Sequence, residues 1–238
     1  MRRAQNFSGN ALTRVIKGHR SDMPGWRGLV SNALALSSSP VSWALARRSI
    51  VTYGAVQHVD ELTAFVKIVR ALRPRTVVEI GTAQGGVFWL FCRLAAEDAT
   101  LVSLDLPPND RFSGGEKKSI NLQAMRRFEQ AVHALHGDSH DPEMLQRLLV
   151  VLNGRPIDLL FIDGDHTYDG VRRDYEMYSS LVRPGGLVAL HDIVRTPWDA
   201  CEVHRFWGEL AADRSLSPGT IISRLPSHFG GIGMVTVR

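Results

Sequence analysis

Acidic and imidazole side chains recur in this sequence where apolar runs end. Such runs have the composition of buried strands, and the carboxyl ends of parallel strands meet at one edge of a sheet. The side chains at these ends are Glu79, Asp105, Asp138, Asp163, Asp165, His166, His191 and Asp192. Gathered at one edge, carboxylates and imidazoles could move a proton or hold a divalent cation.

A glycine-containing turn follows the first of these runs. The β-branched run 76–80 stops at Gly81, and Gly85 and Gly86 then open an apolar helical stretch over 87–96. The order strand, tight turn, helix lets a ligand approach the backbone and offers it free N–H groups. The spacing G-x-x-x-G-G differs from the G-x-G-x-x-G of dinucleotide folds, so a turn without a ligand is the alternative.

Glu79 strengthens the case for a ligand. It stands one residue before the turn, in a run expected to be buried on both faces. Burying an unpaired charge is costly, so this carboxylate needs a polar partner. A cationic ligand or the N–H groups of the turn would supply one.

The remaining elements alternate regularly. A helix is predicted from Asp60 to Pro74, and Pro184-Gly185 suggests a type II turn. Strands are predicted over 76–80, 101–104, 132–135, 157–162 and 187–190, with helices over 87–96, 122–128, 144–151 and 171–181. Five βα units of this kind predict an α/β, doubly wound parallel sheet. A helix over 200–210 and strands over 220–225 and 232–237 add a final antiparallel hairpin, which gives a Rossmann-like, mostly parallel sheet of seven strands.

The N-terminal region is less regular, and we expect residues 1–56 to form a helical cap before a domain over 57–238. Ser39 as N-cap and Pro40 at the first helical position predict a helix through Ala46 that carries Trp43 inward. Trp26 and Trp43 would then either cover a pocket or fill the gap between the cap and the domain.

Composition excludes several classes of protein. The 238 residues are 44% hydrophobic, enough for the core of one large domain, and no apolar run reaches the length of a membrane span. Two cysteines are too few for a disulfide framework and indicate a reducing, cytoplasmic setting. A net charge of +4 permits an anionic substrate but is not the dense basic stripe of a nucleic-acid binder.

An ordered set of motifs resembles the class I S-adenosylmethionine (SAM) dependent methyltransferases from about Tyr53 to the C-terminus. They are Val-Val-Glu-Ile-Gly-Thr-Ala-Gln-Gly-Gly, Ser-Leu-Asp-Leu, Gly-Asp-Ser, Asp-Leu-Leu-Phe-Ile-Asp-Gly-Asp-His-Thr-Tyr-Asp-Gly-Val and Leu-Val-Arg-Pro-Gly-Gly-Leu-Val-Ala-Leu-His-Asp. More narrowly, the chain is similar to the group of cephalosporin-hydroxylase-like proteins and macrolide-sugar (macrocin-type) and aminocoumarin-sugar O-methyltransferases.

The resemblance implies a set of cofactor-binding residues. The turn would lie under the methionine part of SAM with Glu79 near its ammonium, and Asp105 would hold the ribose, although a lone Asp there could also cap the turn. Asp138 and Ser139 would border the adenine. The full cofactor set is Glu79, Gly81, Thr82, Gly85, Asp105, Asp138, Ser139 and Asp163.

Methyl transfer to a hydroxyl requires that the acceptor lose a proton, so a base or a metal must assist. His166 is the candidate base, with Asp165 orienting its ring or replacing it; otherwise His166 would bond a loop carbonyl. Asp163, His191 and Asp192 could share a divalent cation, Mg²⁺ or Mn²⁺, with the imidazole favouring the softer ion. In the alternative without a metal, His191 hydrogen-bonds Asp163.

We therefore expect a methyltransferase acting on a small-molecule hydroxyl, without nucleic acid as a partner and with a homodimer left open. The loop over 107–118 and Trp198 would shape the acceptor site, while Trp207 would pack in the core. The alternatives are a nucleic-acid or protein methyltransferase and a cofactor-binding, non-catalytic partner subunit.

Overall fold

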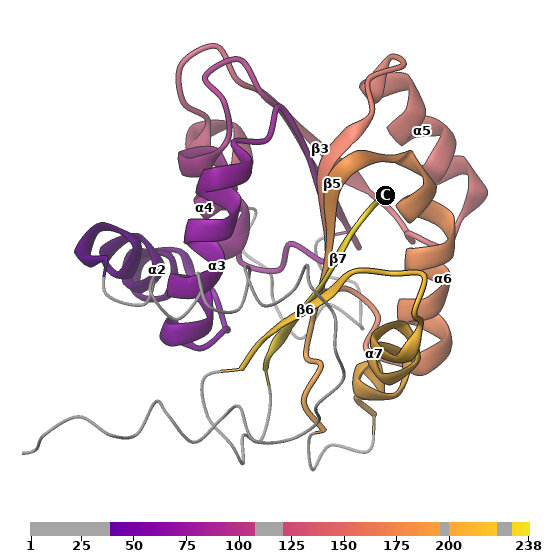
Figure 1. The fold of residues 1–238 in the computed structure, drawn as a ribbon. Helices are drawn as coiled ribbons and strands as arrows, with labels where there is room; N and C mark the ends of the chain where they lie inside the picture. Colours follow the sequence, from indigo (N-terminus) through magenta and orange to yellow (C-terminus); the bar gives the residue numbers. More distant parts are fainter. Residues whose placement is uncertain (1–38, 108–120, 196–199, 223–229) are drawn as a thin grey trace, which may run out of the picture.

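The computed structural model describes residues 39–107, 121–195, 200–222 and 230–238. Trp26, Trp198 and nearly all of the loop over 107–118 lie outside these ranges. The described chain forms a central sheet with helices on both faces, a Rossmann-like arrangement (Figure 1). None of the helices in these ranges is both long and apolar enough to cross a membrane.

The sheet has seven strands in the order β3-β2-β1-β4-β5-β7-β6. They are β1 (Thr76–Ile80), β2 (Thr100–Asp105), β3 (Ala131–His136), β4 (Ile157–Ile162), β5 (Val182–His191), β6 (Pro218–Ile221) and β7 (Ile232–Thr236). The first five are parallel, and β7 runs antiparallel to both β5 and β6. The predicted fold class is confirmed, and the strand order reverses between β1 and β4, where open α/β sheets bind ligands.

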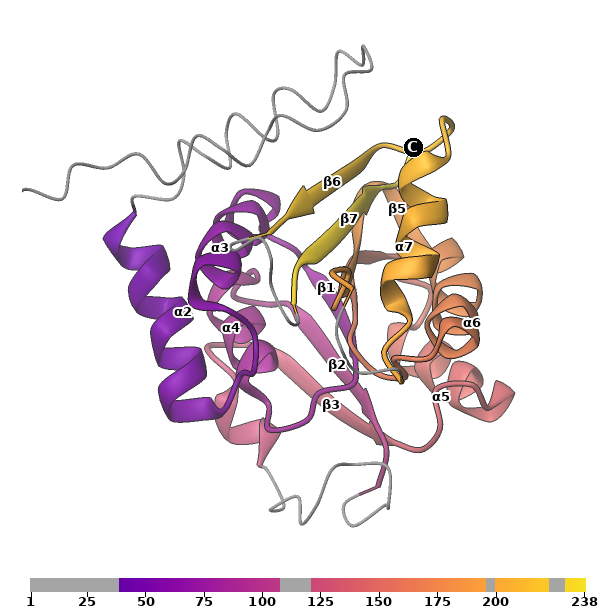
Figure 2. The same cartoon turned by 90° about the horizontal axis from the view of Figure 1, so that it is seen from below.

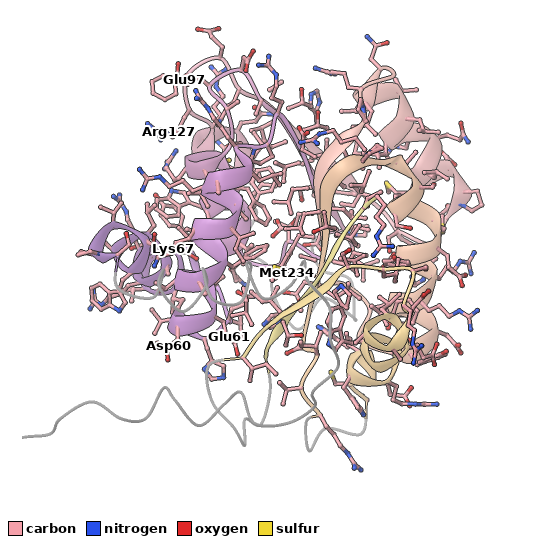
Figure 3. The ribbon with its side chains drawn as sticks, in the orientation of Figure 1. Asp60, Glu61, Lys67, Glu97, Arg127 and Met234 are labelled. Atoms are coloured by element: carbon pink, nitrogen blue, oxygen red, sulfur yellow. The ribbon has the colours of Figure 1, made fainter. Side chains whose placement is uncertain are left out.

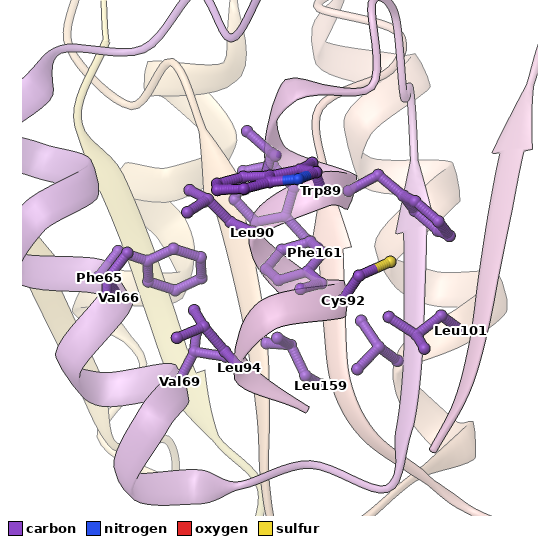
Figure 4. Close-up of a cluster of buried hydrophobic side chains, with 14 of the residues drawn as sticks. Phe65, Val66, Val69, Trp89, Leu90, Cys92, Leu94, Leu101, Leu159 and Phe161 are labelled. Carbon is purple, nitrogen blue, oxygen red and sulfur yellow. The ribbon is translucent and has the colours of Figure 1, made fainter. Parts of the chain in front are cut away.

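The helices of the described ranges lie on both sides of the sheet (Figure 2). Figures 1 and 2 show α2 (Pro40–Tyr53), α3 (Val59–Leu72) and α4 (Gly86–Leu94) on one side, and α5 (Pro142–Leu152), α6 (Tyr168–Tyr178) and α7 (Val203–Ala212) on the other. Of these, α2 packs on α3 and α4 rather than on a strand. Successive residues of a strand point to opposite faces of the sheet, so β4 contributes to two hydrophobic clusters. Leu159 and Phe161 lie in one cluster with residues of α3 and α4, as Figure 4 shows, and Leu160 and Ile162 lie in the other, with residues of α5, α6 and α7.

Helix starts follow the predicted caps. The Ser39 hydroxyl accepts from the Ser42 backbone N–H at the start of α2, with Pro40 in the first turn. The Thr167 hydroxyl accepts from the Gly170 N–H and so caps α6, the helix that positions the residues after β4. The cap of α2 is confirmed, but α2 runs on to Tyr53 and leaves Trp43 49% exposed, so the expectation that Trp43 points inward was wrong.

The prediction of a helix over 122–128 was wrong, because side-chain contacts override the local pattern there. Instead of a helix over 122–128 the chain forms a 3₁₀ turn, Leu122–Met125, and Phe128 is exposed with φ 50°. The Asn121 side chain accepts from the Ala124 N–H at the start of this turn, and the Gln130 carboxamide accepts from the Arg127 N–H after it. The same Gln130 side chain donates to the carbonyl groups of Cys92 and Ala96, which ties the segment to the end of α4.

Pro184-Gly185 lie at a bend inside β5, because Val182 still pairs with Ile157 and the strand continues beyond the bend. Gly185 has φ 76°, the left-handed value that a type II turn requires at its third residue. The helix predicted over 200–210 begins later than expected, because α7 starts at Val203 and Cys201 precedes it. Cys92 and Cys201 are both free and buried.

Candidate active site

The turn after β1 lies against the end of β4, at the point where the strand order reverses. The Gly81 N–H donates to the Leu104 carbonyl (2.9 Å), and the Asp163 N–H donates to the Ile80 carbonyl (2.8 Å). Gly81 has φ 82°, and a Cβ there would lie 2.1 Å from the Asp163 carbonyl oxygen. The glycine brings Asp163 beside the turn, so the protein's own packing requires it independently of any ligand.

The α2–α3 connection closes the other side of the turn. A Cβ at Gly86 would lie 2.2 Å from the Ala55 nitrogen, so the backbone of this connection rests directly on the first residue of α4. Gly54, with φ 74°, packs in the same way against the Gln84 side chain. The turn is thus enclosed by Asp163 on one side and by residues 54–57 on the other.

Glu79 is buried beneath the turn, with only 1% of its surface exposed. Burial raises its pKa well above the ordinary value, and a hydrogen bond with Thr82 opposes the shift. Within the described part of the chain no donor contacts Glu79 Oε2. The polar partner that the sequence requires for this carboxyl is therefore only partly supplied by the protein.

The ends of β2 and β3 carry the residues predicted to face ribose and adenine. Asp105 accepts from the backbone N–H groups of Ala83 (2.9 Å) and Leu106 (2.8 Å), so it does cap the turn. Asp138 accepts from the His140 N–H (2.8 Å), and the Ser139 carbonyl accepts from the Tyr178 hydroxyl (2.5 Å). These contacts fix the two loops; the assignment of ribose and adenine to them stays a prediction.

Asp163 contacts three side chains of the site. Its Oδ2 accepts from the carboxamide of Gln57 (2.8 Å). Its Oδ1 lies 3.2 Å from His191 Nδ1 and 3.4 Å from His166 Nε2. The hydrogen bond with His191 is the one expected in the alternative without a metal.

Asp192 completes the cluster from the end of β5. Its Oδ2 lies 3.3 Å from His166 Nε2, and its Oδ1 accepts from the Gly230 N–H (2.9 Å). Its backbone is left-handed, with φ 58°, which turns the carboxylate back toward Asp163. His166 therefore bridges the two carboxylates, while His191, 4% exposed, lies beneath them.

The electrostatics of the cluster follow from these contacts. The hydrogen bonds to Asp163 and Asp192 raise the pKa of His166 to about 10. Burial would lower the pKa of His191, but the same two carboxylates raise it well above its ordinary value. Burial would raise the pKa of each carboxyl, and the two imidazoles lower both. Two imidazolium and two carboxylate groups thus balance in charge.

The same residues include a group able to hold a metal ion. One ligand atom each from Asp163, His191 and Asp192 lies within 4.8 Å of the others. Oxygen and imidazole nitrogen together suit Mn²⁺ better than Mg²⁺. The donor set fits a divalent cation once the imidazoles have lost their extra protons, since a metal ligand must be deprotonated.

Asp165 does not have the position predicted for it. Its Oδ1 accepts from the Thr167 N–H (2.8 Å), and its side chain lies against Gly170, where a Cβ would come within 2.2 Å of the carboxyl carbon. The carboxylates that contact the His166 ring are Asp163 and Asp192. Asp165 therefore supports the start of α6 and does not orient the ring.

Sequence reasoning missed Gln57 and Glu61, which come from outside the strand ends. Gln57 is 7% exposed and contacts Asp163 from the α2–α3 connection. Glu61 is fully buried, and a Cβ at Gly230 would lie 2.9 Å from its Oε2. Figure 3 shows Glu61 on the side of α3 turned toward β6, whereas Asp60 points outward. An acidic residue in the apolar stripe of α3 was the available signal for Glu61; Gln57 had none.

Comparison with known proteins shows which family of domains and which folds this chain is similar to. Residues 78–193 match the model of a methyltransferase domain family, described as "Methyltransferase domain". Similar folds include the O-methyltransferase TomG from Streptomyces achromogenes in complex with SAM (TM-score 0.54, 18% identity, 89% of this chain and 96% of that one). Another is the MycE methyltransferase from the mycinamycin biosynthetic pathway, in complex with Mg, S-adenosylhomocysteine (SAH) and mycinamycin VI (TM-score 0.55, 17% identity, 84% of this chain and 55% of that one).

Two curated relatives match part of the chain. An uncharacterized protein, y4gI, of Sinorhizobium fredii is 29% identical over 62% of this chain and 16% of its own length. The ribosomal RNA large subunit methyltransferase E of Alkalilimnicola ehrlichii is 32% identical over 43% of this chain and 42% of its own length. The chain thus spans less than half of either relative.

The fold and the glycine turn at the reversal of strand order define a Rossmann-like methyltransferase architecture. In sequence, residues 78–193 match a methyltransferase domain family, and in fold the chain is similar to the methyltransferases named above.

Proposed function

We propose that the protein transfers a methyl group from SAM to a hydroxyl of a small molecule, such as a sugar, a phenol or another natural product. One observation carries the proposal: the glycine turn and the Asp163–His166–Asp192 cluster lie side by side, because the Asp163 backbone packs directly on Gly81. A methyl donor over the turn would face the groups able to handle a proton. The similar fold of TomG, an O-methyltransferase, supports the same choice.

The fit to SAM rests on a buried polar atom without a protein partner. Glu79 Oε2 lacks a donor among the residues described, and an ammonium group would supply one. When bound, SAM provides an electrophilic methyl group on a sulfonium sulfur. The turn would hold its methionine part, Asp105 its ribose, and Asp138 with Ser139 its adenine.

The reaction is an in-line displacement. The acceptor oxygen forms a bond to the methyl carbon, the carbon–sulfur bond breaks, and its electron pair stays on sulfur. The hydroxyl proton passes to His166, which lies 42% exposed at the mouth of the site, and orientation of the two reactants lowers the barrier further. Asp163 and Asp192 then stabilise the imidazolium that forms.

His166 can accept that proton only when its ring is neutral. In the arrangement described here the two carboxylates raise its pKa to about 10, so at pH 7 it is an imidazolium. A divalent cation held by Asp163, Asp192 and His191 would supply positive charge that offsets both carboxylates and would assist deprotonation of a hydroxyl. We propose this metal role as part of the function, with Mn²⁺ as the better match to the donor set.

The test is a methyl-transfer assay with radiolabelled SAM and a panel of sugars and phenols, run with Mn²⁺, with Mg²⁺ and with a chelator. The proposal predicts transfer to at least one hydroxyl acceptor and stimulation by a divalent cation, both abolished in Asp163→Asn. If wild type binds SAM but His166→Ala and Asp163→Asn methylate as fast as wild type, the site proposed here is wrong.

An RNA substrate is the second candidate, because one partial relative is a ribosomal RNA methyltransferase. The sequence after β4 reads Asp-Gly-Asp-His and lacks the Asn/Asp-Pro-Pro-Tyr type of motif that stacks a flipped base. Salt-dependent retention of RNA together with labelled product in RNA would favour this candidate over a small molecule.

A further inference from the structure

Gln57 reaches the site from a segment that the methyltransferase family match does not include. It lies in the connection between α2 and α3, ahead of the matched residues 78–193. The same connection packs on the end of the turn, because Ala55 lies so close to Gly86 that a Cβ on Gly86 would not fit. The backbone that carries Gln57 is therefore fixed against the turn that would hold the methionine part of SAM.

The orientation of the Gln57 carboxamide is determined by its partner. Asp163 Oδ2 lies 2.8 Å from the amide nitrogen, and a carboxylate can only accept, so the NH₂ group must face Asp163. The carbonyl oxygen Oε1 consequently faces away from Asp163. It is buried in a side chain that is 7% exposed, and no donor in the described ranges reaches it.

A second buried acceptor atom without a donor among the described residues belongs to Glu79, which lies close enough to Asp163 to feel its charge. This atom is Oε2 of the carboxyl group. Two buried acceptors without donors, both beside Asp163 and the glycine turn, call for a ligand group with several N–H donors. A primary ammonium carries three N–H groups and a positive charge, whereas a hydroxyl or a water brings at most two donors and no charge.

We propose that Gln57 is a cofactor-binding residue: its Oε1 accepts from the α-ammonium of the methionine part of SAM, opposite Glu79, while its NH₂ holds Asp163. This inference rests on the proposed function and adds a residue from the α2–α3 connection to the cofactor site. The side chain thus links the bound cofactor to the carboxylate of the reaction centre.

The experiment compares binding of two ligands by isothermal titration calorimetry, SAH and the SAH analogue whose α-amino group is replaced by hydrogen. Gln57→Leu removes both halves of the carboxamide, and Gln57→Met, closer in length, serves if the first variant folds poorly. Gln146→Leu on the exposed surface of α5 is the matched control. Thermal unfolding of each variant checks the fold.

We expect Gln57→Leu and Gln57→Met to bind SAH about tenfold or more weakly, as for loss of a hydrogen bond to a charged group, and to bind the desamino analogue within about twofold of wild type. Equal losses for both ligands, or no loss for either, would overturn the proposal, because a residue that only holds Asp163 cannot sense the amino group. Failure of wild type to bind SAH at all would instead refute the proposed function.

Discussion

The two halves of the candidate site differ in how far the protein satisfies its own polar groups. At the ends of β4 and β5, the carboxylates of Asp163 and Asp192 are each contacted by both imidazoles, and the charges balance. At the turn after β1, in contrast, Glu79 is buried as a carboxyl with an oxygen that lacks a donor in the described structure. The turn is ready to receive a polar ligand, whereas the β4–β5 half must give up internal contacts before it can act on one.

This difference separates binding from chemistry. Changes at the turn should appear mainly in cofactor affinity, and changes in the β4–β5 half mainly in turnover. The predictions that follow test this separation, beginning with the largest expected effect on activity.

Asp163→Asn should lower the rate of methyl transfer about 10³-fold or more, because one carboxylate contacts both imidazoles and a proposed metal at the reaction centre. Asp165→Asn is the matched control from the same loop, and since Asp165 only supports the start of α6 it should retain turnover within about threefold. Steady-state kinetics under saturating SAM measure both. Comparable losses in the two variants would contradict the roles given to these carboxylates.

His166→Ala should lower turnover about 10²-fold while leaving SAH affinity nearly unchanged, because the ring handles a proton and does not contact the turn. In wild type, kcat/KM should rise with pH, since only the neutral ring accepts a proton and its pKa is raised to about 10 without metal. Added Mn²⁺ should shift this rise to lower pH. A pH–rate profile that is flat from pH 6 to 10, or identical with and without metal, would count against His166 as the base.

Glu79→Gln should weaken SAH binding about 10- to 100-fold with a smaller effect on turnover at saturation, because a charge-assisted hydrogen bond to the ammonium is lost. Burial raises the pKa of Glu79, so a cation that binds beside it should favour the carboxylate and release a proton wherever the ligand-free protein holds Glu79 protonated. Calorimetry in buffers of different ionisation enthalpy measures that proton. Wild type should release it and the variant should not; equal proton release by both would contradict the assignment.

The same residue gives a prediction for stability. A carboxyl whose folded-state pKa is raised contributes stability below its ordinary pKa, and this contribution is lost as pH rises through the raised value. In the absence of ligand, the Glu79→Gln variant should therefore become more stable relative to wild type as pH increases. Urea unfolding at a series of pH values from the ordinary carboxyl pKa upward tests the sign, and a difference that stays constant over the whole series would contradict the raised pKa of Glu79.

His140, partly buried in the loop after β3, and the fully buried Asp174 of α6 form a pair that should matter for stability more than for activity. The His140 Nε2 lies 3.3 Å from Asp174, which is fully buried, and that contact raises the pKa of His140. Its contribution is present below the ordinary histidine pKa and is lost as pH rises through the raised one.

Removing that pair should cost about 1–3 kcal/mol near pH 6 in His140→Asn, and less as pH rises, with turnover within about threefold of wild type. Denaturant unfolding across pH compares the variant with wild type. A loss of turnover as large as that of His166→Ala would place this pair in the reaction centre and contradict its purely stabilising role.

Much of the fold and of the site could be predicted from the sequence because both depend on local pattern and one topological rule. Apolar runs ending in polar residues predicted the strands, and the rule for parallel sheets then brought Glu79, Asp163 and Asp192 to one edge. The antiparallel end strands followed from the absence of a helix between two late apolar runs.

The parts that could not be predicted depend on contacts between distant segments. Gln57 reaches Asp163 across 106 residues, and no local pattern marks it. Gly81 looked like a glycine kept small for a ligand, but its first constraint is the carbonyl of Asp163. The protonation state of His166 depends on two carboxylates from different strand ends, which a sequence does not rank by distance.

A crystal structure of the protein with SAH and Mn²⁺, with anomalous data at the manganese edge, tests the central claim most directly. The account predicts SAH over the turn 81–85, its amino group between Glu79 and Gln57, its sulfur facing the cluster, and an anomalous peak between Asp163 and Asp192. SAH bound away from this turn, with Asp163 and His166 remote from its sulfur, would contradict the account.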